Sequence, residues 1–206
     1  MPRKVEADPI DVVTKFVEAA GKVTDAVYIG IDPGASGAIG LLCNHLSAVI
    51  DIPVIKVERA GRTAKGNKKT TTLFDRSAIV EIFRLFRPVK ARVCVRIERS
   101  QVQRKGKGAS AYNGYRVGCA FAMWLLFIHA KGYGLGYEEV DPSTWKRVMG
   151  LIGKGKNASR YKAQGLWPNA PLARVADHDR AEALLLAEYA RRQREAPAPK
   201  KKRKGQ

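Results

Sequence analysis

Short apolar runs separated by turn residues open the central part of the chain. Residues 27–31, 38–43 and 47–52 are almost entirely apolar, with brief polar or glycine-containing segments between them. Runs of this length predict buried β-strands, and their short connections predict an antiparallel meander. Two later runs, residues 91–98 and 134–142, predict further strands, the first of which ends in an acid.

Apolar residues at helical spacing occupy the segments between and after these strands. Residues 73–88 and 117–132 predict helices, a short helix starts at residue 142, and residues 177–192 predict a last helix with acids in its first turn. Asp177 is the expected N-cap of that helix. Strands alternate with helices after the initial meander. This order predicts an α/β fold, a mixed five-stranded sheet with helices on both faces.

Composition divides the chain into three parts. Residues 1–26 form an N-terminal extension that includes a short amphipathic helix, residues 27–192 form the main domain, and residues 193–206 form a basic tail that we expect to be disordered. Within the main domain, residues 53–72 carry six basic residues and two glycines. That composition predicts either a solvated loop or a flexible hairpin.

The charge of the chain indicates a polyanionic partner. Lys and Arg number 38 against 19 Asp and Glu, which gives a formal charge of +19 and a pI near 10.1. Nucleic acid is the first candidate, and removing the five basic residues 200–204 still leaves +14. No apolar run approaches the roughly 18 residues that span a bilayer, so we expect no membrane partner. Cys43, Cys94 and Cys119 stand in apolar contexts and predict reduced core residues.

Four acids stand where separate elements could bring them together. Asp32 and Glu98 each end a predicted strand, and Asp179 and Glu182 lie three residues apart at the start of the last helix. Carboxylates gathered in one cleft repel each other unless cations hold them, and Mg²⁺ prefers such oxygen ligands. Two ions would support attack of water on a phosphodiester. Each acid alone also fits an ordinary turn, a surface pair or a helix-dipole role, and Asp177 is an adjacent alternative ligand.

Four segments that contain these acids resemble the landmark segments of RuvC-type Holliday junction resolvases, in the ribonuclease H-like superfamily. They read GIDPGASGAIGL, VRIERSQ, VDPSTWKRVMG and DHDRAEALLLAEYA. The phage-borne and plant-organellar branch is the most similar. The resemblance implies a homodimeric endodeoxyribonuclease with two Mg²⁺ ions per site, for which Mn²⁺ substitutes. It implies 5′-phosphate products, four-way DNA junctions as substrate and no small-molecule cofactor. Asp32, Glu98, Asp179 and Glu182 become the metal ligands.

Basic segments around these acids supply the expected contacts with DNA. The resemblance implies that Lys162, with Lys146 as the second choice, assists near the scissile phosphate. The segment after Glu98 would enter the centre of the junction, where Gln can read base edges and cations hold phosphates. Tyr112 would stack on a base or cap the next helix. The predicted DNA-binding residues are Arg99, Gln101, Gln103, Arg104, Lys105, Lys107, Tyr112, Lys146, Lys154, Lys156 and Arg160.

Two functions remain open at this stage. The first is a structure-selective DNA endonuclease that resolves four-way junctions, and the second is a non-catalytic branched-DNA binding protein with the same fold. We expect the protein near the nucleoid of a bacterium or of a phage-infected cell. The string PKKKRK in residues 199–204 fits a nuclear or organellar address, a DNA-binding arm or a tag equally well.

Overall fold

The computed structural model describes residues 7–22, 26–62, 68–87, 89, 93–100, 111–130, 136–155 and 157–195. The strands are β1 (Val27–Ile31), β2 (Ala38–Cys43), β3 (Leu46–Asp51), β4 (Val54–Arg62), β5 (Lys68–Phe74), β6 (Val93–Glu98) and β7 (Gly136–Val140). The helices are α1 (Pro9–Ala20), α2 (Arg76–Leu85), α3 (Ala111–Ala130), α4 (Pro142–Val148), α5 (Asn157–Leu166), the 3₁₀ helix η1 (Val175–Asp177) and α6 (His178–Glu195).

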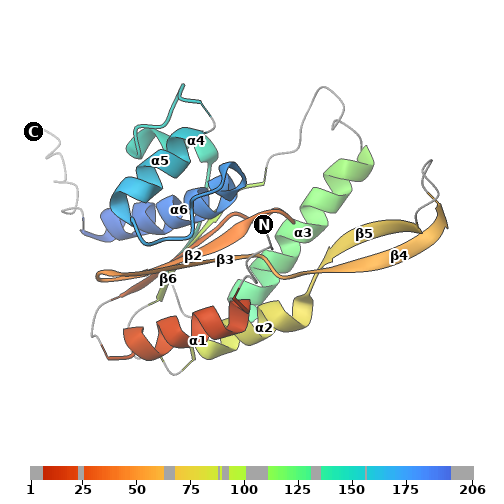
Figure 1. Ribbon diagram of the computed structural model, residues 1–206, viewed down its shortest axis with the longest axis horizontal. Coiled ribbons are helices and arrows are strands. Elements are labelled where there is room, and N and C mark those ends of the chain that lie inside the picture. Colours follow the sequence, from red (N-terminus) through yellow and green to blue (C-terminus); the bar gives the residue numbers. More distant parts are fainter. Residues whose placement is uncertain are drawn as a thin grey trace, which may run out of the picture.

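Five of the strands form one mixed sheet in the order β3-β2-β1-β6-β7. β1, β2 and β3 are antiparallel neighbours, whereas β6 runs parallel to both β1 and β7. Helices cover both faces of this sheet (Figure 1), so β1 and β2 are buried along their whole lengths. The predicted mixed five-stranded sheet with helices on both faces is therefore confirmed. Of the helices described, none has the length and apolarity needed to cross a bilayer.

One face of the sheet packs on α1, α2 and α3. The apolar stripe of α1 buries Val13 and Phe16 in the same core as the sheet residues Ile29 and Leu41. Asp8 caps this helix by accepting a hydrogen bond from the Ile10 amide. The amphipathic helix expected in the N-terminal extension is confirmed, and packing joins it to the main domain.

The other face packs on α6, and small residues allow the helix to approach the sheet closely. Gly30 and Gly40 lie directly opposite each other on β1 and β2. A Cβ atom at Gly40 would lie 2.5 Å from backbone atoms of Ala183 and Leu184, closer than packed atoms come. At this point the sheet therefore presents bare backbone to the helix. The position of α6 over the sheet depends on this pair of glycines.

The segment at residues 53–72 is a two-stranded hairpin rather than a loop. β4 and β5 pair antiparallel in a sheet of their own that projects from the body beside α3 (Figure 1). The next helix starts at Arg76, three residues later than expected, because Leu73 and Phe74 still belong to β5. Asp75 ends the strand and caps α2 by accepting a hydrogen bond from the Ala78 amide.

Two helical boundaries, one additional helix and one cysteine also differ from the expectations. α3 begins at Ala111 instead of residue 117, and α5 is a helix that the sequence did not predict. α6 continues to Glu195, so the first three residues of the expected disordered tail are helical, and residues 196–206 lie outside the described part. Cys43 and Cys94 are buried as expected, whereas Cys119 is exposed on α3. The expectation of a buried Cys119 was wrong, because α3 turns that side toward solvent.

Candidate active site

Asp32 and Glu98 leave the ends of two neighbouring parallel strands. Ile31 of β1 pairs with Ile97 of β6, so the residues that follow stand side by side. Side chains alternate between the two faces of a strand. Asp32 and Glu98 therefore point to the face that carries Gly30 and α6. Strand register alone brings the two carboxylates together on the helix-covered side.

The other two acids come from the start of α6. Asp179, Ala183 and Ala187 recur at intervals of four and form one ridge of the helix. Because the two alanines lie on the glycine pair of the sheet, Asp179 stands at the end of this ridge, over the strand ends. Glu182 lies on the neighbouring ridge, three residues along. The close approach of α6 therefore sets the height of both acids above Asp32.

The pKa values show that these acids share one electrostatic environment. Burial and the negative charges of Glu98 and Asp179 raise the pKa of Asp32 to about 7. Burial also raises the pKa of Glu98 above its usual range, and Glu182 and Asp179 add to the shift. The pKa of Asp179 is raised too, mainly by burial. The predicted meeting of Asp32, Glu98, Asp179 and Glu182 is thus seen in the fold.

Helix α4 contributes two consecutive side chains to this cluster. Trp145 is fully buried, and its indole N–H donates a hydrogen bond of 2.7 Å to Glu98. Lys146 Nζ lies 2.9 Å from a carboxylate oxygen of Glu182. Burial raises the pKa of Glu98, and the Trp145 hydrogen bond opposes that shift because it favours the charged carboxylate. The sequence did not predict this polar contact of Trp145, because nothing in the local pattern indicates a partner 47 residues away.

Neighbouring elements orient the remaining parts of the cluster. The Ser159 hydroxyl of α5 donates to Glu182 over 3.0 Å. The Trp124 indole of α3 donates to the Pro33 carbonyl and so holds the turn that follows Asp32. In that turn the Gly34 amide donates a long hydrogen bond of 3.4 Å to Asp32. Four helices thus take part in positioning the acids, three of them through hydrogen bonds with distant segments.

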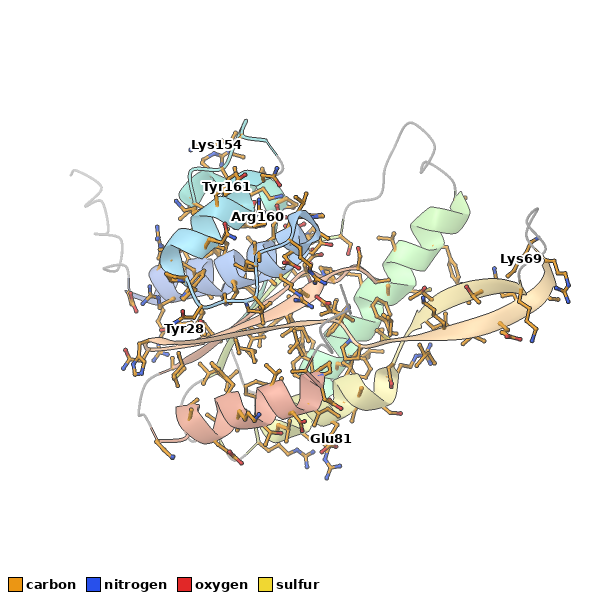
Figure 2. All side chains as sticks on the ribbon, viewed as in Figure 1. Tyr28, Lys69, Glu81, Lys154, Arg160 and Tyr161 are labelled. Atoms are coloured by element: carbon orange, nitrogen blue, oxygen red, sulfur yellow. The ribbon has the colours of Figure 1, made fainter. Side chains whose placement is uncertain are left out.

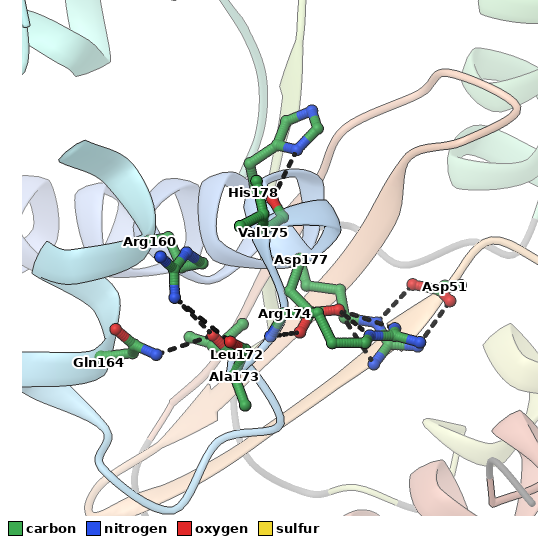
Figure 3. A network of polar contacts seen from close by, with 10 residues as sticks. Asp51, Arg160, Gln164, Leu172, Ala173, Arg174, Val175, Asp177 and His178 are labelled. Carbon is green, nitrogen blue, oxygen red and sulfur yellow. Dashed lines mark hydrogen bonds and ion pairs between the residues drawn. The ribbon is translucent and has the colours of Figure 1, made fainter. Parts of the chain in front are cut away.

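A polar network fixes the start of α6 to the end of the sheet (Figure 3). Arg180 donates two hydrogen bonds to Asp51, at the end of β3. Asp177 is almost fully buried and accepts hydrogen bonds from the backbone and the guanidinium of Arg174. Asp179 lies in the chain between Asp177 and Arg180, which are both anchored, so the network restricts the movement of Asp179.

The predicted role of Asp177 needs correction. It directly precedes α6, as an N-cap would, but it ends η1 and its carboxylate turns back to Arg174. Arg174 and Arg180 hold its pKa below the usual range. Asp177 is therefore an anchoring residue, and it is not a spare metal ligand beside Asp179. The adjacent His178 pairs with Asp179 instead, with 3.0 Å between Nε2 and Oδ1.

The chemistry of the donors fits a hard divalent cation, although the side chains do not form a closed cage. Within the described residues, no three acids, histidines or cysteines stand close enough to hold one ion as they lie. The charges of Glu98, Asp179 and Glu182 nevertheless reach Asp32, since each of them raises its pKa in addition to the larger effect of burial. A cation would relieve the repulsion among these carboxylates. Lys146 and His178 now satisfy part of Glu182 and Asp179, so an entering ion would replace contacts that these acids already make.

Two arginines predicted to bind DNA have structural partners. Arg160 is buried, and its guanidinium donates to the carbonyls of Leu172 and Ala173 (Figure 3). Its predicted phosphate contact is wrong, because it supports the loop before η1 from inside. Arg99 is half-exposed and binds the carboxylates of Glu139 and Asp141. Arg99 therefore links β6 to β7 and α4, and it is not a free cation for phosphate.

The remaining predicted DNA contacts divide into accessible and undescribed residues. Lys154 is exposed beyond α4 (Figure 2), and Lys162 is half-buried on α5, one turn after Ser159. The structure places Lys146, the second choice of the two lysines, 2.9 Å from Glu182. Tyr112 lies in the first turn of α3, and its side chain is outside the description. Outside the described residues altogether are Gln101, Gln103, Arg104, Lys105, Lys107 and Lys156.

Comparisons with known proteins find similarity at the level of the fold. A structure of T. thermophilus RuvC in complex with a Holliday junction substrate aligns over 81% of this chain and 95% of its own, at 19% sequence identity and a TM-score of 0.48. A Thermus thermophilus RuvC structure aligns over 81% and 96%, at 22% identity and a TM-score of 0.43. No protein-family model and no curated protein matches the chain. Values this low leave the function to be argued from the site itself.

Proposed function

We propose that this protein is a metal-dependent, structure-selective DNA endonuclease that resolves four-way junctions. The observation that carries the proposal is the convergence of four carboxylates from the ends of β1 and β6 and from α6 in a chain of charge +19: burial and then the charges of the other three acids raise the pKa of Asp32 to about 7. The resemblance of the four sequence segments to RuvC-type resolvases supports the choice of substrate. Assignment to the phage and plant-organellar branch, 5′-phosphate products and a homodimer are parts of the same proposal.

Asp32, Glu98, Asp179 and Glu182 are the residues that would hold the cations. Bound there, two Mg²⁺ ions would promote deprotonation of the attacking water and stabilise the charge on the leaving oxygen. The chain itself orients the acids: Trp145 fixes the rotamer of Glu98, and Ser159 fixes that of Glu182. Lys146, once released from Glu182, would contact the phosphate beside the acids, and its ion pair with Glu182 supports this role. Lys162 stays a candidate for the same task.

A cleavage assay on a synthetic four-way junction tests this function, with linear duplex and fork substrates as controls. We expect symmetric nicks in the junction with Mg²⁺ and none with EDTA. Asp32→Asn and Glu98→Gln should lower the rate at least about 100-fold while junction binding is retained. Glu81→Gln is a matched control, because Glu81 pairs with Arg84 on the surface of α2 (Figure 2). This variant should cut the junction at the wild-type rate.

The outcomes separate the two candidate functions. Retained Mg²⁺-dependent cutting by either site variant would refute the assigned cluster. Tight junction binding by the wild-type protein without cleavage of any branched DNA would instead identify a non-catalytic branched-DNA binding protein. The open arrangement of the carboxylates among the described residues is the observation that keeps this second candidate in view.

A further inference from the structure

The β4–β5 hairpin is the largest feature of the fold that the proposed active site does not use. It forms a sheet of two strands only, and every residue of β4 is exposed. Figure 2 shows Lys69 near its far end, away from α4, α5 and α6. Its base is closed by a hydrogen bond from the Asp75 amide to the Pro53 carbonyl. Packing against the body does not explain the side-chain pattern of so exposed a ribbon, so we consider which ligand the pattern fits.

The two faces of the hairpin carry different side chains. Val54 and Phe74 pair at its base on one face, where the Phe74 ring contacts Trp124 of α3. Farther out on this face, Glu58 binds Lys68 over 2.7 Å. Side chains alternate between the two faces of a strand, so the residues that stand between these positions in the register lie on the opposite face. We call it the open face. It consists of Ile55, Val57, Arg59, Lys69, Thr71 and Leu73.

The open face is both apolar and basic. Ile55, Val57 and Leu73 are exposed apolar residues, with 45%, 40% and 45% of their surface accessible. Toward the tip, Arg59 lies directly opposite Lys69. Like charges at directly opposed positions destabilise a ribbon, and no acid is present among the six residues of this face. The arrangement weakens the free hairpin and favours an anion between the two cations.

We propose that the open face of the β4–β5 hairpin binds the sugar–phosphate backbone of a duplex DNA arm. Arg59 and Lys69 contact phosphates, the Thr71 hydroxyl donates to a phosphate oxygen, and the apolar residues nearer the base pack on deoxyribose. A two-stranded ribbon also has the width that the major groove of B-DNA admits. This inference rests on the proposed function in taking DNA as the polyanion, and it adds a second contact region remote from the cutting site.

Charge argues for DNA over a second copy of this chain. Two open faces packed on each other would bring four cations together without an acid between them. The acid on the hairpin, Glu58, lies on the other face and pairs there with Lys68. The open face is therefore complementary to a polyanion and repels itself.

Binding measured without cleavage tests this inference. The double variant Arg59→Ser/Lys69→Ser is compared with Lys15→Ser/Lys22→Ser, which removes two exposed charges near α1. Fluorescence anisotropy with a four-way junction and with linear duplex is recorded in EDTA between 50 and 200 mM salt. Each phosphate contact contributes about 0.9 to the salt slope. We expect the hairpin variant to lose about 2 from that slope and to bind about tenfold more weakly at 50 mM salt, with the control close to wild type.

Thermal unfolding and single-turnover cleavage complete the experiment. Removing opposed like charges should leave the melting temperature unchanged or higher, and saturating protein should cut at the wild-type rate. Thr71→Glu, a single change that adds an acid to the open face, should also weaken binding. Wild-type affinity and slope in both variants would overturn the inference, as would altered sedimentation with unchanged DNA affinity. A wild-type protein that binds but never cuts would refute the nuclease function and leave this result intact.

Discussion

Gly40→Ala should separate α6 from the sheet and disturb the acids that the helix carries. The added Cβ would lie 2.5 Å from Ala183 C and Leu184 N, whereas ordinary contacts begin near 3.4 Å. These are backbone atoms, so no side-chain rotation relieves the clash. The helix or the strand has to move by about 1 Å, because interiors are close-packed. Ala183 lies one turn after Asp179, which must move with it.

The expected magnitudes follow from that displacement. Overpacking of this size costs about 1–3 kcal/mol of unfolding free energy, which lowers the melting temperature of a chain this long by about 2–12 °C. A shift of about 1 Å in a catalytic group can lower the rate as much as 100-fold. Thermal unfolding and single-turnover junction cleavage at 20 °C, where the variant is still folded, measure the two effects separately.

Gly165→Ala provides the control. Gly165 is exposed on α5, and a Cβ there meets no atom within 4 Å. The change should leave cleavage as it is and raise helix stability by up to about 1 kcal/mol. A Gly40→Ala protein with wild-type melting temperature would refute the close approach. A lower melting temperature with an unchanged cleavage rate would refute the link between that approach and the acids.

Two further predictions concern charge. Metal-free protein should lose up to about 4 kcal/mol of stability as the pH rises from about 4 to about 7, because folded Asp32, with a pKa of about 7, keeps a proton that the unfolded chain has released. Melting curves in EDTA from pH 5 to 8 measure this loss, and equal slopes for wild type and Asp32→Asn would contradict it. Arg180→Gln, which frees Asp51, should lower the melting temperature by several degrees and cleavage about tenfold. The surface control Arg84→Gln should change neither, and similar effects in both variants would count against the anchoring network.

The central strands were predictable because their burial leaves a clear pattern. β1 and β2 are covered on both faces, and such strands appear in the sequence as continuous apolar runs. For residues 53–72 the sequence did not distinguish a hairpin from a loop. β4 and β5 are exposed and mix Lys and Thr with apolar residues, so they leave no continuous apolar run. α5 was missed because its stability comes from packing Ser159 and Ala163 on α6, which no local pattern records.

The acids of the candidate site were predictable, but their supporting contacts were not. Asp32 and Glu98 end strands, and neighbouring parallel strands bring their ends together. The contacts of Trp145 and Lys146 depend on how α4 docks, which is set by residues far away in the chain. Arg160 shows the limit of counting charges. A basic stretch has the same sequence pattern whether its arginine binds phosphate or, as here, donates hydrogen bonds to the backbone carbonyls of Leu172 and Ala173.

The placement of cations around the acids is the strongest argument that the cluster exists for a purpose other than folding. The chain has two basic residues for every acid, and arginines bind Asp51, Asp177 and Glu188. Asp32 has a different environment: its pKa is raised first by burial and then by three acids, and it is lowered by one weak backbone hydrogen bond, from Gly34. None of these main influences, taken over the described residues, is a cation. A sequence optimised for stability alone would have paired this carboxylate, and its lack of such a partner is the reason for proposing that the site receives positive charge from outside the chain.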